Sequence, residues 1–96
     1  MIKPEEAPKR AYDELKSEYW GDREGTFIVA DVDLEDATDY CVSAGAKEWF
    51  VDGNPAFISI DDTFFFMNKE TGELRRASMS NDDDVAKLEA MSQIYV

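Results

Sequence analysis

The apolar run from Phe64 to Met67 constrains the fold of this chain more than any other feature. Alternate side chains of a strand point to opposite faces, so a strand with this sequence is apolar on both faces and belongs inside a sheet. The next segment, Asn68-Lys69-Glu70-Thr71-Gly72-Glu73, has the polar residues and the glycine of a hairpin turn. We therefore predict a central strand, a tight turn and a returning strand over residues 74–79.

Helices are predicted at both ends of the chain. Residues 4–20 begin with a proline, which suits a first helical position, and Ala11 and Leu15 continue an apolar stripe until Gly21 ends the helix. Residues 82–94 form the second predicted helix, where Ser80 and Asp83 have the spacing of a helix cap. Strands are predicted over 26–32 and 39–44, with a polar loop at 33–36 and a helical turn at 46–51.

The predicted order of elements is α-β-β-β-β-α, which places the chain in the α+β class. The connections between strands are too short for helical crossovers, so we expect an antiparallel four-stranded sheet. A chain of 96 residues fits a single domain, residues 1–96. Both helices are expected on one face of the sheet, over a core that comprises Leu15, Ile28, Val42, Phe65, Leu74 and Leu88.

The charge of the chain restricts its partners. There are 10 basic and 22 acidic residues, a net charge of −12. This charge repels nucleic-acid phosphates and anionic membranes, so neither is an expected partner, whereas a basic protein is. The first residues contain no apolar leader, and the lone Cys41 cannot form an internal disulfide. We therefore expect a cytoplasmic protein.

Few residues of the chain suit catalysis or metal binding. There is no histidine and no glycine-rich phosphate loop, so we expect no enzyme activity and no cofactor. The segment 31–36 begins like a calcium-binding EF-hand loop, but Asp36 stands where that loop needs glycine and Val42 where it needs glutamate, so no metal is expected. Cys41 lies in a predicted strand and is expected to be inert. The enzymatic alternative is a hydrolase that uses a pair among Asp31, Asp33, Asp61 and Asp62.

Acidic residues concentrate between Asp31 and Asp62, where nine acids accompany one base, Lys47. Four aromatic residues lie in the same segment: Tyr40, Trp49, Phe50 and Phe57. An acidic surface with aromatic anchors is typical of a site for a basic protein, although the aromatics can instead belong to the core beneath a solvated acidic face. The candidate partner-binding residues are five acids in predicted loops and one aromatic anchor: Asp33, Glu35, Asp36, Asp61, Asp62 and Trp49.

Two turns in the second half of the chain carry a family resemblance. A Gly53-Asn54-Pro55 turn precedes the Phe-rich strand, which ends in Asn68-Lys69-Glu70-Thr71-Gly72-Glu73-Leu74. Over about residues 26–79 the chain resembles immunity protein family 35 of bacterial polymorphic toxin systems, whose members commonly have aspartate at the position of Asn68. The resemblance implies a small protein that binds and neutralises a cognate toxin and has no catalytic residue. The alternative is an acidic adaptor with no toxin partner.

Overall fold

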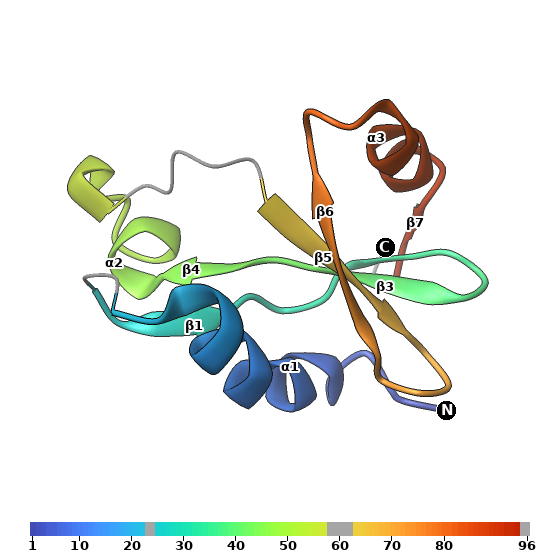
Figure 1. Cartoon of the computed structure of the whole chain (residues 1–96), viewed down its shortest axis with the longest axis horizontal. Coiled ribbons are helices and arrows are strands. Elements are labelled where there is room, and N and C mark those ends of the chain that lie inside the picture. Colours follow the sequence, from blue (N-terminus) through green and yellow to red (C-terminus); the bar gives the residue numbers. More distant parts are fainter. Residues whose placement is uncertain (23–24, 58–62, 95–96) are drawn as a thin grey trace.

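The Phe-rich strand is the centre of an α+β fold with two antiparallel sheets (Figure 1). The structure is a computed structural model, and it describes residues 1–22, 25–57 and 63–94. The elements follow one another as α1 (Ala7–Leu15), η1 (Lys16–Trp20, a π-helix), β1 (Phe27–Val29), β2 (Leu34–Glu35), β3 (Asp39–Val42), β4 (Ala44–Ala46), α2 (Lys47–Phe50), η2 (Pro55–Phe57, a 3₁₀ turn), β5 (Thr63–Asn68), β6 (Leu74–Ser78), α3 (Asp82–Glu89) and β7 (Ser92–Gln93).

The larger sheet has five strands in the order β6-β5-β3-β2-β7, and the smaller sheet pairs β1 with β4. β5 has a neighbour on each side, which confirms its predicted interior position. The hairpin that follows it is also confirmed: Gly72 has a φ of +77°, a left-handed conformation that favours glycine. The predicted four-stranded sheet is wrong, because β2 and β7 are two-residue strands that join the same sheet and β1 leaves it to pair with β4.

The two faces of β5 belong to two hydrophobic clusters. Phe65 and Met67 pack with Leu15 and other residues of α1 on one face, and Phe64 and Phe66 pack with Met91 and the half-buried Leu88 of α3 on the other. The prediction that both helices cover one face is therefore wrong. A strand that is apolar on both faces needs cover on both sides, and α1 and α3 supply it from opposite directions (Figure 1).

Half of the predicted core list is fully buried. Leu15, Val42 and Phe65 are buried, whereas Leu74 and Leu88 are half-buried against the two clusters. Ile28 is half-buried but packs in neither cluster, so its predicted place in the core is wrong; β1 turns Phe27 inward instead. Trp20 and Tyr12 contact the Phe27 ring, with centroids 5.4 and 5.2 Å away.

Several element boundaries also differ from the prediction. Gly45 lies between the predicted strand 39–44 and the predicted helical turn 46–51, but in the structure it belongs to β4 and pairs with Ile28. Leu34–Glu35, predicted as loop, is β2. The last helix ends at Glu89, and its cap is Asn81 rather than Ser80: the Asn81 side chain accepts hydrogen bonds from the N–H groups of Asp83 and Asp84.

Candidate functional site: an acidic and apolar cavity between α2 and α3

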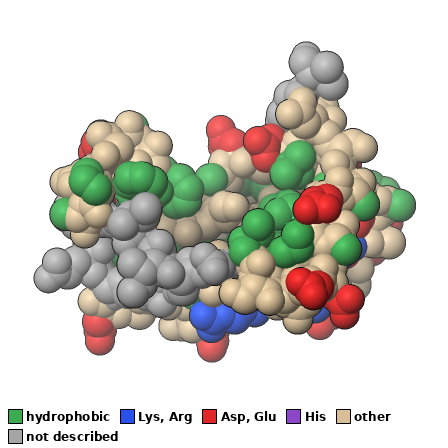
Figure 2. All heavy atoms as spheres, turned by 90° about the horizontal axis from the view of Figure 1, so that it is seen from above, with side chains coloured by type: hydrophobic (Ala, Val, Ile, Leu, Met, Phe, Trp, Pro, Cys, Tyr) green, Lys and Arg blue, Asp and Glu red, His purple; other side chains and the backbone are tan. Residues whose placement is uncertain are grey.

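A cavity of about 500 Å³ opens on the side of the large sheet that faces α3. Its apolar lining comes from distant parts of the chain, with Phe50 at the end of α2, Phe64 on β5, Met79 after β6 and Leu88 on α3. Asp31 and Asp33 also line it. Figure 2 views the molecule from this side, and hydrophobic and acidic side chains lie next to one another on the face.

Two of the apolar side chains are unusually exposed for their size. Phe50 is 44% exposed and Met79 is 49% exposed. The Phe50 ring packs directly against the backbone of Gly45, since a Cβ built on that glycine would lie 2.7 Å from the ring. The chain therefore positions an aromatic ring at the cavity rather than burying it. Exposed apolar side chains beside polar ones are typical of protein-binding surfaces.

A local irregularity sets the position of the two acids. The segments 27–35 and 40–46 run antiparallel, with Phe27 paired with Ala46 at one end and Glu35 paired with Tyr40 at the other. The first segment is therefore two residues longer than the second. The extra length falls in the segment between β1 and β2. There Val32 is 3% exposed, while its neighbours Asp31 and Asp33 are both exposed. Burial of the central valine directs the flanking carboxylates to solvent.

Most of the other described acids of the segment 31–62 form ion pairs or hydrogen bonds with residues of the protein itself. Glu35 forms an ion pair with Lys69 at 2.7 Å, and Lys87 contacts both Asp36 at 2.6 Å and Asp39 at 2.9 Å. Both carboxylate oxygens of Glu48 accept from the backbone N–H of Thr26 at 2.9 Å. Asp31, Asp33 and Asp52 remain, all exposed and without an ion pair to any residue that the structure describes.

The electrostatics of Asp36 agree with a structural role. Burial alone would raise its pKa, but hydrogen bonds from Lys87 and from the backbone N–H groups of Asp39 and Thr38 outweigh burial and lower the pKa to about 2. The same carboxylate therefore caps the turn between β2 and β3 and attaches α3 to it.

The structure divides the predicted site residues into four groups. Asp33 is exposed at the cavity, as expected for a binding residue. Glu35 and Asp36 are half-buried in ion pairs, and Glu35 lies in a strand rather than the predicted loop. Trp49 is half-buried, and the ring that reaches the cavity is that of its neighbour Phe50. Asp61 and Asp62 lie outside the described residues.

Sequence reasoning missed Met79 and the binding potential of Phe50. Phe50 was visible as one of the four aromatics of the acidic segment, but nothing in the sequence indicated that its ring would pack against Gly45 and stay exposed. Met79 ends the predicted returning strand and carried no signal of its own. Both gain their position from contacts between segments far apart in the chain.

Cys41 is half-buried on the cavity side of β3. Burial, assisted by the nearby Asp33 carboxylate, raises the pKa of its thiol to about 11. The thiol therefore stays protonated at neutral pH and is a poor nucleophile. Within residues 1–22, 25–57 and 63–94, no three side chains of the metal-binding types gather closely enough to hold an ion.

The motif that carries the family resemblance has a clear structural role. The Asn68 side chain accepts from the N–H groups of Glu70 and Thr71, and the Gly72 N–H donates to the Asn68 carbonyl at 2.8 Å. Lys69 is buried, and its backbone bonds Ile2 and Thr38 while its ammonium pairs with Glu35. The motif closes the β5–β6 turn and fastens the N-terminal segment to it.

No helix within the described residues is long and apolar enough to cross a membrane. No protein-family model, curated protein or solved structure matches the chain. Membership of the immunity family therefore remains a prediction that depends on the two turns and the strand between them.

Proposed function

We propose that this protein is a small acidic immunity-type protein, which binds a basic toxin and neutralises it through the cavity between α2 and α3. The observation that carries the proposal is the pairing of free carboxylates with exposed apolar side chains: Asp31 and Asp33 stand beside Phe50 and Met79 in one cavity. A basic protein would place lysine or arginine against the two acids and an apolar side chain against the ring.

The charge balance supports a basic partner over a neutral one. Each chain carries a net charge of −12, and the carboxylates at the cavity have no basic neighbour to satisfy them in the described part of the chain. Attraction over the Debye length of about 8 Å at physiological salt speeds association with a positively charged protein. The proposed location is the cytoplasm, where such a toxin would act.

A growth assay tests the proposal. The product of each reading frame that adjoins the gene is tested for toxicity in a host, and a toxic product is then expressed together with wild-type protein or with the double variant Asp33→Lys/Phe50→Ala. We expect wild type to restore growth and the double variant to fail, because the variant loses one charge contact and the exposed ring. The matched control is Asp13→Lys/Glu14→Lys, which changes two exposed acids of α1 away from the cavity.

Two results would contradict the proposal. If the control variant fails as badly as the double variant, total charge rather than the cavity decides binding. If wild-type protein itself gives no protection from the neighbouring gene product, the alternative of an acidic adaptor with no toxin partner is favoured. Thermal melts of each variant ensure that a lost effect does not come from a lost fold.

A further inference from the structure

On one side of β1 no strand of the described residues pairs. Among the described strands β1 pairs with β4 alone, through bonds that include Lys47 N–H to the Thr26 carbonyl at 2.7 Å and Ala30 N–H to the Ser43 carbonyl at 2.8 Å. In an antiparallel pair, every second residue of a strand bonds its partner. Residues 26, 28 and 30 therefore face β4, and the backbone groups of Phe27 and Val29 face the opposite edge. No other described strand pairs there.

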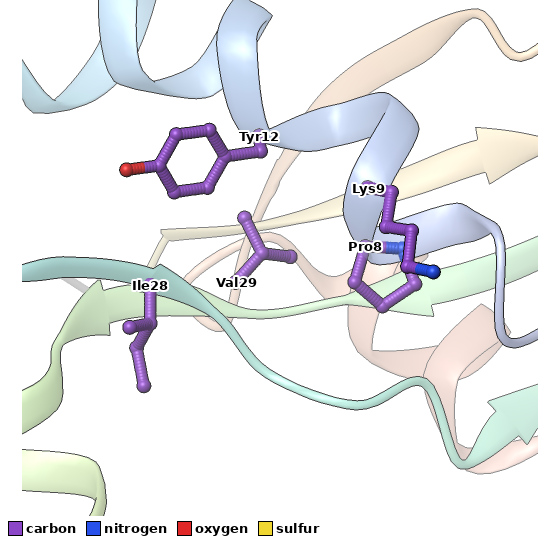
Figure 3. Close-up of a pocket in the computed structure, with 5 residues that line it drawn as sticks. All are labelled: Pro8, Lys9, Tyr12, Ile28 and Val29. Atoms are coloured by element: carbon purple, nitrogen blue, oxygen red, sulfur yellow. The ribbon is translucent and has the colours of Figure 1, made fainter.

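An apolar groove lies along this free edge. It has a volume of about 420 Å³ and lies between α1 and β1 (Figure 3). Pro8 and Tyr12, one helical turn apart, line it from α1, together with the aliphatic stem of Lys9. Ile28 and Val29 line it from β1, and both are half-buried, with Val29 also packed against the larger hydrophobic cluster. The groove is therefore shaped by a strand edge on one side and a helix on the other.

The groove becomes acidic at one end. A second hollow of about 300 Å³ shares Pro8 with the first and is lined by Pro4, Val32 and two carboxylates, Glu5 and Asp31. Both carboxylates are exposed, and neither has an ion pair with a described residue. The surface thus combines an apolar groove, backbone groups of β1 that no described strand pairs with, and two carboxylates that have no ion pair with a described residue.

We propose that the free edge of β1 binds an extended peptide segment of a basic protein as a third strand of the β1–β4 sheet. Backbone bonds to Phe27 and Val29 supply the pairing, apolar side chains of the segment fill the groove against Tyr12, and a lysine or arginine contacts Glu5 and Asp31. A second copy of this chain is disfavoured as the occupant, since each copy carries a net charge of −12.

This inference goes beyond the proposed function, because the edge of β1 and the α2–α3 cavity share only Asp31 among their lining residues.

The test of this inference uses the capped peptide Val-Thr-Val-Thr-Lys-Thr in an NMR titration of labelled full-length protein. Alternation places both valines and the lysine on one face of the extended peptide. We expect shifts centred on residues 27–31 and slower hydrogen exchange at the amides of Phe27 and Val29. The same peptide with glutamate for lysine should bind at least tenfold more weakly.

Three variants connect the binding to the edge. Val29→Pro removes an outward N–H and keeps the bonds of the neighbouring residues to β4, so it should weaken peptide binding at least tenfold. Glu5→Lys should weaken it to a similar extent. The matched control Asp52→Lys alters an exposed, unpaired acid outside the groove and should leave the affinity within twofold of wild type.

The proposal is overturned if the peptide does not bind, or if the lysine and glutamate peptides bind equally well. It is also overturned if the shifts fall on Phe50 and Met79, which would place the peptide in the cavity and leave the proposed function intact. If Val29→Pro unfolds the protein, the exchange of the wild-type Val29 amide decides: protection by the peptide supports strand addition, and unchanged exchange refutes it.

Discussion

Lys87 connects α3 to the rest of the sheet. Its ammonium lies 2.6 Å from Asp36 and 2.9 Å from Asp39, and 5.2 Å from the centre of the Phe66 ring. Burial alone would lower the pKa of Lys87, but the hydrogen bonds to the two carboxylates outweigh it and raise the pKa. The lysine therefore stays charged at neutral pH, and it balances two acids that would otherwise repel each other.

Replacement of this lysine tests its role. Lys87→Met keeps the aliphatic volume but leaves two partly buried carboxylates without a counter-charge, so we expect a loss of roughly 2 kcal/mol in the free energy of unfolding. Urea denaturation measures this loss. Lys9→Met is the matched control, because Lys9 is exposed and has no ion pair within the described residues, and a change below about 0.5 kcal/mol is expected there. Equal effects of the two changes would contradict the role of Lys87.

Asp36 makes the stability of the protein dependent on acid pH. Its pKa falls from 3.8 to about 2 in the folded protein, so its contribution is fully present above pH 4 and is lost as the pH falls toward 2. We expect this to remove roughly 1 to 2 kcal/mol after allowance for solvent screening. Asp36→Asn should therefore be less stable at pH 6 and show a flatter stability curve between pH 4 and 2. An unchanged slope would mean that other carboxylates control the acid response.

At the scale of elements, α3 depends on a cap and on an ion pair to β6. Asn81 caps its first turn, and Asp84 accepts from Arg75 at 2.9 Å and from the Ser78 N–H at 3.1 Å. The hydrogen bond from Arg75 lowers the pKa of Asp84, which keeps it ionised at neutral pH. These contacts hold the helix over the face formed by Phe64 and Phe66.

The cap gives a prediction for this element. Asn81→Ala removes the acceptor for two backbone N–H groups and should cost about 1 kcal/mol of unfolding free energy. Asn81→Ser keeps a capping oxygen and should recover most of that loss. Thermal or urea unfolding compares the three proteins. If alanine and serine behave alike, the side chain of Asn81 is not the effective cap.

The sequence predicted elements where a local pattern determined them. The two-faced apolar run gave β5 an interior position, and the turn residues from Asn68 to Gly72 gave the hairpin. β2 and β7 were not predictable, because a two-residue strand carries no periodicity and exists only through its neighbours. The prediction placed Gly45 in no element for a similar reason: the missing side chain leaves room for the Phe50 ring, which is a tertiary contact that the local pattern does not show.

The same limit applied to the candidate site. The concentration of acids between residues 31 and 62 was visible in the sequence, but which of these acids form ion pairs within the protein was not. Glu35 forms an ion pair with Lys69, and Asp36 and Asp39 form ion pairs with Lys87. Each lysine lies at least 34 residues along the chain from the acid that it contacts. Only the fold separates the acids that hold the protein together from those that remain free to bind.

For the whole molecule, net charge is an unfavourable contribution to stability that experiment can adjust. The chain has 22 acidic residues and 10 basic ones, so its excess negative charges repel one another in the folded state. Salt screens this repulsion, and the partly buried ion pairs of Lys69 and Lys87 are screened less than exposed charges. Added salt should therefore stabilise the protein.

The size of the salt effect follows from the range of the repulsion. The Debye length falls from about 30 Å at 0.01 M salt to about 8 Å at 0.15 M, well below the longest dimension of 35 Å. We expect a gain of about 1 kcal/mol over this range, which raises Tm by about 4–8 °C in a domain of this size. Asp13→Lys/Glu14→Lys reduces the net charge from −12 to −8, so it should melt higher than wild type at 0.01 M salt and respond less to added salt. Calorimetry at both salt concentrations measures the effect. A Tm that falls with added salt would contradict this prediction, because it would show that attraction within ion pairs outweighs the repulsion among the acidic residues. The acidic residues would then serve mainly to form ion pairs within the protein and not to bind a partner.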